Sequence, residues 1–289
     1  MNSLLTNAVA GLTAGGAYAL LGVCATFTFR LVAVVNFAGA AIGASGAFAF
    51  ALLVEVGTPI WGGAIAGLLF GALVGVLVGE IMTRWFAEAS TSIKAAVSTA
   101  LLVGVTAVGL RVTGGQRPHE FPELLSGSAF RLLGVEVTNT AIAMLGLAML
   151  FTLLIGLFLN RSHVGLQLRA LSERPAAAEL IGIPVHQLSL WVWAIGGAAT
   201  TLALMLIAPQ RAPNFLGLSL LVVPALASAL IGFFRSFWAT LLGGVVIGEM
   251  ESLISGFSGL GAYRTAVPFL VIIAVLLWSQ RGGRWDDAR

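Results

Sequence analysis

Charged residues are scarce in this chain of 289 residues, where Asp, Glu, Lys and Arg together account for 9%. Soluble globular domains are about one-quarter charged. Hydrophobic residues make up 58% of the sequence, and the mean hydropathy is +1.00. Apolar runs of spanning length recur along the whole chain, which argues against a soluble domain with a signal peptide or a single anchor. The composition therefore indicates a polytopic membrane protein.

Residues that bind metals or perform acid–base chemistry are also few. Cys24 is the only cysteine, so a disulfide or a thiolate metal cluster within one chain is excluded. Both aspartates lie in the terminal "RWDDAR", and His119 is expected on the opposite side of the membrane from His163 and His186. A membrane enzyme would need a convergent cluster of such residues at one face. We therefore expect no catalytic site and no metal site. The basic residues are scattered between apolar segments, so we expect no nucleic-acid partner either.

Nine apolar segments are predicted to be helices. Backbone groups in lipid must pair internally, and the alternating segments of a barrel are missing. The nine segments are 4–29, 31–54, 60–82, 95–112, 137–160, 188–208, 218–234, 237–256 and 263–279. Because 31–54 is rich in Gly and Ala, it is either a clean span or a broken or re-entrant helix. Glycines at every fourth position from 63 to 75 predict close helix packing. The expected fold is a single all-α transmembrane bundle over 1–289, with about eight or nine spanning helices.

The basic residues predict an orientation, since Lys and Arg are enriched in cytoplasmic loops. Placing the connection 161–187 inside gives ten basic residues inside and five outside. The inside set is Arg30, Arg84, Lys94, Arg161, Arg169, Arg174, Arg235, Arg281, Arg284 and Arg289. In this orientation the connection 113–136 is external, the C-terminus is cytoplasmic, and the protein is a multi-pass protein of the cell (inner) membrane.

The connection 161–187 predicts a short helix between charged residues. Ser172 is expected to cap it, Pro175 suits its first turn, and Gly182 ends it. A helix of this length is marginal alone in water. We therefore expect a partner to dock against it.

Three stretches carry a resemblance to a known family. "GLQLRALSERPAAAELIGIPV" resembles the cytoplasmic loop of the permease subunits of branched-chain amino acid ABC transporters. The N-terminal "AGLTAGGAYALLGVCATFTFRLVAVVNFAGAAIGASGAF" is similar to the family's opening, including the box Asn36, Phe37 and Ala38. "PNFLGLSLLVVPALASALIGFFRSFWATLLGGVVIGEMESLI" resembles its paired late helices. The ordered combination covers nearly the whole chain and is specific, although each motif alone is weak.

The resemblance implies an inner-membrane permease that works with other subunits. Partner ATPases, two per transporter, would dock on the cytoplasmic loop as on a coupling helix and use ATP, and the chain itself would bind no cofactor. This agrees with the absence of a Gly-x-x-x-x-Gly-Lys-Ser/Thr phosphate loop. A second permease subunit, identical or different, and an external solute-binding protein would complete the assembly in the lipid bilayer. The residues assigned to the coupling loop are Gly165, Leu168, Arg169, Ala170, Leu171, Glu173, Arg174, Pro175, Ala177, Ala178, Leu180, Gly182 and Ile183.

Within this loop, charged and apolar side chains are expected to play different parts. Arg169, Glu173, Arg174 and Glu179 are assigned to a polar docking surface, and the apolar contact is assigned to Leu171, Leu180 and Ile183. The alternative is that the charges serve only as cytoplasmic topology signals.

The chain also departs from the family pattern. Gly39-Ala40 replaces the usual His-Gly after Asn-Phe-Ala, and 231–236 replaces Gly-Gly-Leu-Gly-Ser. Ser279-Gln280-Arg281-Gly282 stands where Arg-Pro-x-Gly is usual. The family implies branched-chain or related small amino acids as solutes, and small amides or nucleosides stay open as alternatives.

Polar residues within the apolar segments are the candidates for the translocation pathway. A carboxylate deep in a span must face a cavity or a partner, so Glu249 or Glu251 either lines the pathway or bonds a neighbouring helix or the interface. Asn36 is expected to hold a helix break beside the pathway or to contact the solute. The full candidate set is Tyr18, Asn36, Phe37, Gly39, Gly43, Glu249 and Glu251.

Two other classes of protein remain as alternatives. An ion-gradient-driven secondary transporter would want paired charges deep in several helices, and only Glu249 and Glu251 meet that description. An integral membrane enzyme would need the convergent cluster that the sequence lacks.

Overall fold

The computed structural model describes residues 2–132, 135–173, 175–211, 214–257 and 259–280. The helices up to the middle of the chain are α1 (Asn2–Val32), α2 (Gly39–Glu55), α3 (Ile60–Trp85), α4 (Thr91–Val112), α5 (Asn139–Arg161), α6 (His163–Glu173) and α7 (Pro175–Leu180). They are followed by α8 (Val185–Ile207), η1 (Ala208–Gln210), α9 (Phe215–Ser219), α10 (Val222–Ile231), α11 (Phe237–Ser255), η2 (Gly261–Ala266) and α12 (Val267–Gln280). Two short strands, β1 (Ser128–Leu132) and β2 (Val135–Thr138), lie between α4 and α5.

The predicted all-α bundle is confirmed. Over the described ranges, seven helical stretches are long and apolar enough to cross a membrane, and two shorter apolar stretches cover 39–55 and 215–231. These nine stretches correspond one to one to the nine predicted segments. Because two of the stretches are short, the sequence predicts a range of eight or nine spans and not a single number.

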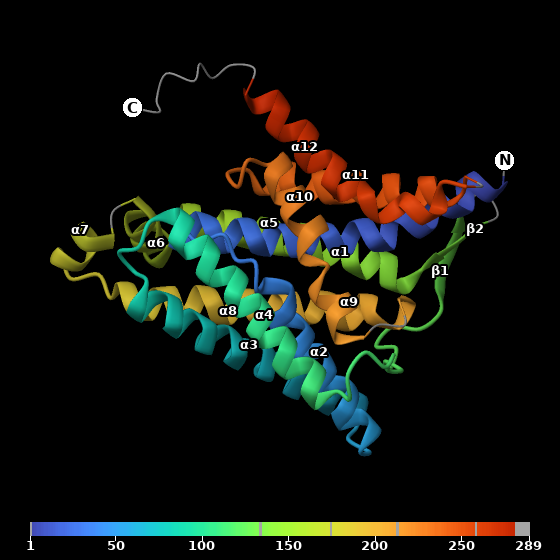
Figure 1. Cartoon of the computed structure of the whole chain (residues 1–289), viewed down its shortest axis with the longest axis horizontal. Helices are drawn as coiled ribbons and strands as arrows, with labels where there is room; N and C mark the ends of the chain where they lie inside the picture. The colour runs from blue at the N-terminus through green and yellow to red at the C-terminus, as the bar shows by residue number, and fades with distance from the viewer. Residues whose placement is uncertain (1, 133–134, 174, 212–213, 258, 281–289) are drawn as a thin grey trace.

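Helix α1 forms the centre of the bundle. Within an 18-residue apolar stretch of this helix, 72% of the residues are buried, a larger share than in any other long span of the described chain. It packs against α5, α8, α10 and α11 (Figure 1). At 1.5 Å per residue its 31 residues extend about 47 Å, enough to run the full depth of a bilayer.

Small residues bring the central helices into backbone contact. A Cβ atom on Gly15 of α1 would lie 2.9 Å from the Cα of Val245 in α11, and one on Gly248 would overlap the backbone of Gly15. The predicted glycine stripe of α3 packs in the same way, since a Cβ on Gly71 would lie 3.2 Å from the carbonyl oxygen of Gly197 in α8. Without a hydrophobic drive between helices in lipid, such close approach supplies the packing energy.

Two apolar stretches are interrupted. After α1 the chain turns at Ala33, which has a φ of 53°, and α2 begins only at Gly39, so 31–54 is a broken segment. The backbone N–H of Phe37 in this break donates to Ser98 Oγ of α4 at 2.8 Å. The prediction of one helix over 218–234 is wrong, because α9 and α10 are separate helices. Pro224 lies in the first turn of α10, where its missing N–H costs no helical hydrogen bond.

The long axis of the molecule has two different ends (Figure 1). Helices α6 and α7 form one end. The opposite end carries the start of α1 and the hairpin β1–β2, which falls in the connection predicted to be external. The hairpin pairs Arg131 with Glu136 across the strands, with a 2.5 Å ion pair, and was not predicted from the sequence. It shifts the following span, since α5 starts at Asn139, where the hydroxyl of Thr138 accepts from the N–H of Ala141.

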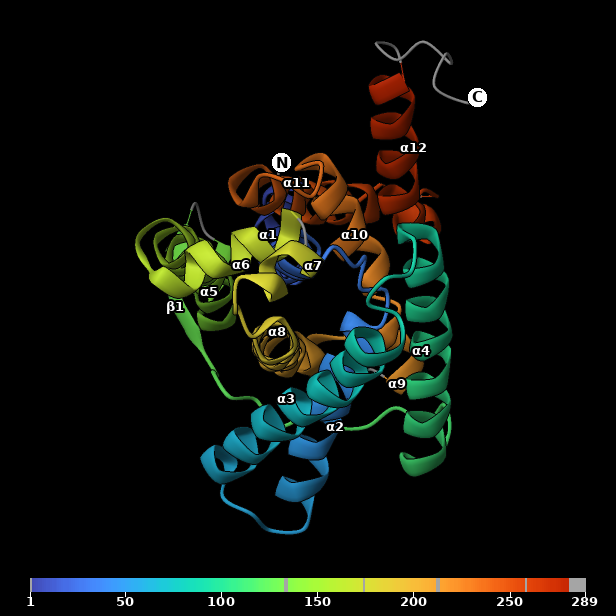
Figure 2. The ribbon, with the colours of Figure 1, turned by 90° about the vertical axis from the view of Figure 1, so that its left-hand side faces the viewer.

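Two spans lie at the edge of the bundle. In α4 and in the span that contains α12, only 11% of the residues in an 18-residue apolar stretch are buried. Figure 2 shows both on the same side of the molecule. Their exposed side chains, among them Val103, Val108, Leu270 and Ile273, are apolar. This face is therefore available to lipid or to another membrane protein.

Candidate functional site

Helices α6 and α7 form the first candidate site. The hydroxyl of Ser162 accepts from the N–H of Gly165 at 2.8 Å and so begins α6 directly after α5. Gly165 is required by space, because a Cβ there would lie 2.5 Å from the carbonyl oxygen of Phe158. The guanidinium of Arg169 donates to the carbonyl of Leu159 and to the amide oxygen of Asn160 at the end of α5. These contacts fix the angle at which α6 leaves the bundle.

The predicted coupling residues divide into two faces. Gly165, Leu168, Leu171 and Ala178 are buried against the bundle. The exposed residues are Arg169, Glu173, Ala177, Glu179, Leu180 and Gly182. Ala170 and Ile183 are half-buried between the two sets.

The apolar residues predicted to contact a partner differ in exposure. Leu171 was expected to touch a docked partner, but only 2% of it is exposed, because α6 itself packs on the bundle. Leu180 is 89% exposed and its neighbour Ile181 is 75% exposed. Leu180 and Ile181 are therefore the exposed apolar side chains at this end of the bundle.

The short helix α7 has the predicted position but a different start. Ser172 does not cap it, because it lies in the last turn of α6, where its hydroxyl donates to the carbonyl of Arg169 at 2.8 Å. Helix α7 begins at Pro175, and Arg174 lies outside the described residues. Gly182 follows with a φ of 84°, a conformation that glycine adopts without strain, and the chain then turns into α8.

A polar cavity of about 570 Å³ forms the second candidate site, at the end of the bundle opposite α7. Its walls come from α1, from the end of α8, the connection to α9 and α9 itself, and from α11 and η2. The polar and charged residues that line it are Asn7, Gln210, Arg211, Asn214, Glu251, Ser252, Ser255 and Arg264.

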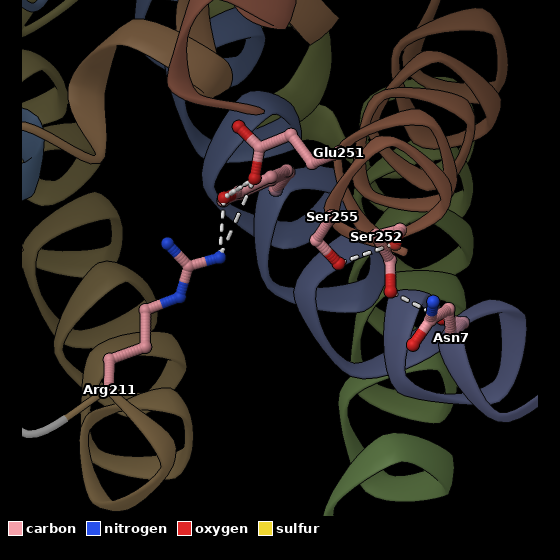
Figure 3. Close-up of polar contacts among 6 residues, drawn as sticks. Asn7, Arg211, Glu251, Ser252 and Ser255 are labelled. Carbon is pink, nitrogen blue, oxygen red and sulfur yellow. Dashed lines mark hydrogen bonds and ion pairs between the residues drawn. The ribbon is translucent and has the colours of Figure 1, made fainter. Parts of the chain in front are cut away.

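Two of the lining residues, Arg211 and Glu251 (Figure 3), form a cluster with Tyr18, and we call this pair the floor of the cavity. The hydroxyl of Tyr18 donates to Glu251 Oε2 at 2.6 Å and accepts from Arg211 Nη2 at the same distance. Arg211 Nη2 also lies 3.7 Å from Glu251 Oε2, and its guanidinium lies over the Tyr18 ring at 5.4 Å. Tyr18 and Glu251 are buried, at 1% and 8% exposure. A buried carboxylate is stable only when paired, and this cluster supplies the pairing.

Tyr18→Phe tests the cluster by removing only the hydroxyl. The ring packing stays, but the buried carboxylate loses a charged hydrogen bond, so we expect a loss of about 1–3 kcal/mol in stability. The thermal unfolding midpoint of the detergent-purified protein measures it. Tyr263→Phe is the matched control, since Tyr263 is the other of two tyrosines and is 66% exposed. Equal midpoints for the two variants would contradict the role given to the cluster.

The remaining pathway candidates lie apart from this cluster. Glu249 packs against α1, since a Cβ on Gly11 would lie 2.9 Å from Glu249 Oε2. Asn36 and Gly39 line a small cavity beside α1 and α8, where Asn36 Oδ1 is buried without a hydrogen-bond partner among the described residues. Gly43 packs on Thr200 of α8, and Phe37 belongs to the break before α2. The seven candidates therefore do not converge on one site.

Arg211 was missed as a site residue and was counted only as an external topology charge. Its partner Tyr18 is 193 residues away in the sequence, so no local spacing joins them. The one available signal was its place in the polar interruption "APQRAPN" between two apolar stretches.

Comparison with known proteins covers nearly the whole chain. The family model described as "Branched-chain amino acid transport system / permease component" matches residues 7–276. A probable branched-chain amino acid transport permease protein LivH of Methanocaldococcus jannaschii is 29% identical, over 55% of this chain and 50% of its own length. The high-affinity branched-chain amino acid transport system permease protein BraD of Pseudomonas aeruginosa is 23% identical over 96% of this chain and 94% of its own.

A solved structure shares the fold. PsaBC from Streptococcus pneumoniae in complex with Fab aligns with a TM-score of 0.53 and 17% identity, covering 94% of this chain and 91% of that one. At this identity the likeness concerns the fold alone. The family match, which extends over nearly the whole chain, places this protein in the family of the permease component of branched-chain amino acid transport systems.

Proposed function

We propose that this chain is the membrane-spanning permease subunit of an ATP-driven ABC importer. Its solutes are branched-chain or related small amino acids, delivered by an external binding protein. Family membership and the names of the relatives support the class of transporter and of solute. The observation that carries the mechanism is the pair α6–α7, which is anchored to α5 by Arg169 and presents Leu180 and Ile181 at one end of the bundle.

The proposed mechanism transmits force through α6. A partner ATPase binds α7. Movement of the ATPase is passed to α5 because Gly165 and Arg169 hold α6 against the end of α5. ATP is used by the partners, one ATPase for each of two permease subunits, while this chain takes no catalytic part. We assign the second permease subunit, identical or different, to the face of α4 and α12, the least buried of the long spans.

The composition of the purified particle tests this function. We expect the chain to co-purify in detergent with two ATPase subunits and a second permease, measured by native mass spectrometry. Leucine uptake into proteoliposomes should require ATP inside and the binding protein outside. A transport-competent particle that contains this polypeptide alone would overturn the proposal.

The orientation makes a separate prediction. With α6 and α7 in the cytoplasm, Glu179→Cys should resist an impermeant maleimide in intact cells and react after solubilisation, while Ser126→Cys should react at once. Both native positions are exposed, so access and not burial decides the labelling, and the native Cys24 is buried. Mass shifts of the purified protein report the reaction. Reversed labelling would place α7 and the C-terminus outside and remove the coupling assignment.

A further inference from the structure

The polar cavity opposite α7 carries an unequal set of charges. Two arginines, Arg211 and Arg264, face it together with one carboxylate, that of Glu251. Arg211 and Glu251 already neutralise each other at 3.7 Å. Arg264 sits at the exposed rim, in η2. The cavity therefore offers a cation to an incoming anionic group.

The buried pair also keeps unused bonding capacity. Over the described chain, the hydrogen bond from Tyr18 and the ion pair with Arg211 both use Oε2 of Glu251, which leaves Oε1 as an acceptor. Only Nη2 of Arg211 is engaged in the same way, and Figure 3 shows its other terminal nitrogen turned away from Glu251. Tyr18 bonds both partners and fixes them side by side. A positive and a negative group are thus held next to each other at the cavity floor.

Besides these charged groups and the polar Asn7, Gln210, Asn214, Ser252 and Ser255, the wall has aliphatic residues. Ala10, Ala14, Ile207 and Leu218 line the cavity between the polar groups. A volume of about 570 Å³ holds a small solute together with water. The cavity therefore combines opposite charges with an apolar surface.

We propose that this cavity is a binding site of the permease itself for a free aliphatic α-amino acid, with the α-carboxylate on Arg211 and Arg264 and the α-ammonium on Glu251. An α-amino acid carries its two opposite charges on one carbon atom, which matches the adjacent pair on the floor. Arginine is suited to carboxylates because its planar fork donates two parallel hydrogen bonds. The inference rests on the proposed function and adds a solute site within this chain.

Direct binding in the absence of the binding protein tests the proposal. The permease–ATPase complex in lipid nanodiscs is titrated with L-leucine, with 4-methylpentanoate, which lacks the ammonium, and with 3-methylbutylamine, which lacks the carboxylate. Leucine should bind at least tenfold more tightly than either analogue, because each analogue leaves one charge of the pair unmatched. Isothermal titration calorimetry measures the three affinities.

Two variants and one control assign the residues. Arg264→Gln is expected to weaken leucine binding about tenfold and, being at the rim, to keep the fold. Glu251→Gln should remove the preference for leucine over 4-methylpentanoate. Arg131→Gln, at the same end but outside the cavity, should bind leucine normally.

The outcomes separate this inference from the proposed function. If the complex assembles with its ATPases and transports leucine, but leucine does not bind or Arg264→Gln binds it normally, the inference fails alone. If Arg264→Gln weakens capture of the binding protein and no solute binds, the cavity receives an acidic side chain of that protein and the solute site is refuted. If no ATPase joins the complex, the proposed function fails first.

Discussion

Replacing Leu180 with aspartate is expected to abolish ATP-driven leucine uptake while leaving the protein inserted and folded. Leu180 ends α7, is 89% exposed and makes no part of the buried core. If a partner ATPase covers it, the substitution buries an unpaired carboxylate in the interface. Such burial costs several kcal/mol, and each ~1.4 kcal/mol is tenfold in affinity. Docking should therefore weaken by orders of magnitude. Ala177→Glu, on the exposed part of the same helix, should act in the same direction.

The measurement is uptake together with co-elution of the ATPase. Val56→Asp is the matched control, because Val56 is 87% exposed but follows α2, far along the chain from α7. It should keep both uptake and ATPase association. If Leu180→Asp also keeps both, the charged stretch around α7 is only a topology signal, and the coupling role lies elsewhere in the chain.

The exposed leucine also differs from a second leucine that was predicted to have the same role. Leu171 and Leu180 occur in one polar connection, and both were assigned to the partner's side. The structure separates them, because α6 is a second helix whose buried residues Gly165, Leu168 and Leu171 recur every three positions. That spacing is present in the sequence and indicates an amphipathic helix. The prediction of a single short helix in this connection did not include it.

The helices that cross the bundle were the predictable part of the fold. Because the thickness of the hydrocarbon core sets a minimum length for a spanning helix, the apolar runs along the sequence predict where these helices lie. Breaks inside such runs depend on single residues and are harder to place. Gly and Ala in 31–54 signalled the break before Gly39, whereas Pro224 within 218–234 was a signal that went unused.

No local pattern in the sequence predicts the polar cavity. At its floor, Glu251 of α11 and Arg211 between α8 and α9 both bond to Tyr18 of α1, and Tyr18 and Glu251 are 233 residues apart. Tyr18 and Glu251 were each selected as polar residues in apolar segments, but nothing in their spacing pairs them. Packing of α1 between α8 and α11 creates the cluster, and that arrangement is tertiary information.

Gly248→Ala tests this packing with the smallest possible change. A Cβ on Gly248 of α11 would overlap the backbone nitrogen and Cα of Gly15 in α1, and backbone atoms cannot rotate away as a side chain can. The two helices must move apart, which we expect to cost about 1–3 kcal/mol or more. The thermal unfolding midpoint of the detergent-purified protein should fall. Because α1 and α11 also carry Tyr18 and Glu251, the Tyr18–Glu251 hydrogen bond should lengthen with the separation.

The control is the same substitution at a glycine with free space. Gly146 lies within α5, and apart from its chain neighbours and the backbone of its own helix no described atom is within 4 Å of the position that its Cβ would take. Alanine is favoured over glycine inside helices by up to about 1 kcal/mol, so Gly146→Ala should leave the midpoint unchanged or raise it. If the same glycine-to-alanine change lowers the midpoint at Gly248 and does not lower it at Gly146, the difference reports the backbone contact and not helix propensity. A Gly248→Ala protein as stable as Gly146→Ala would show that α1 and α11 are not in backbone contact, and the cavity floor built on that contact would have to be redrawn.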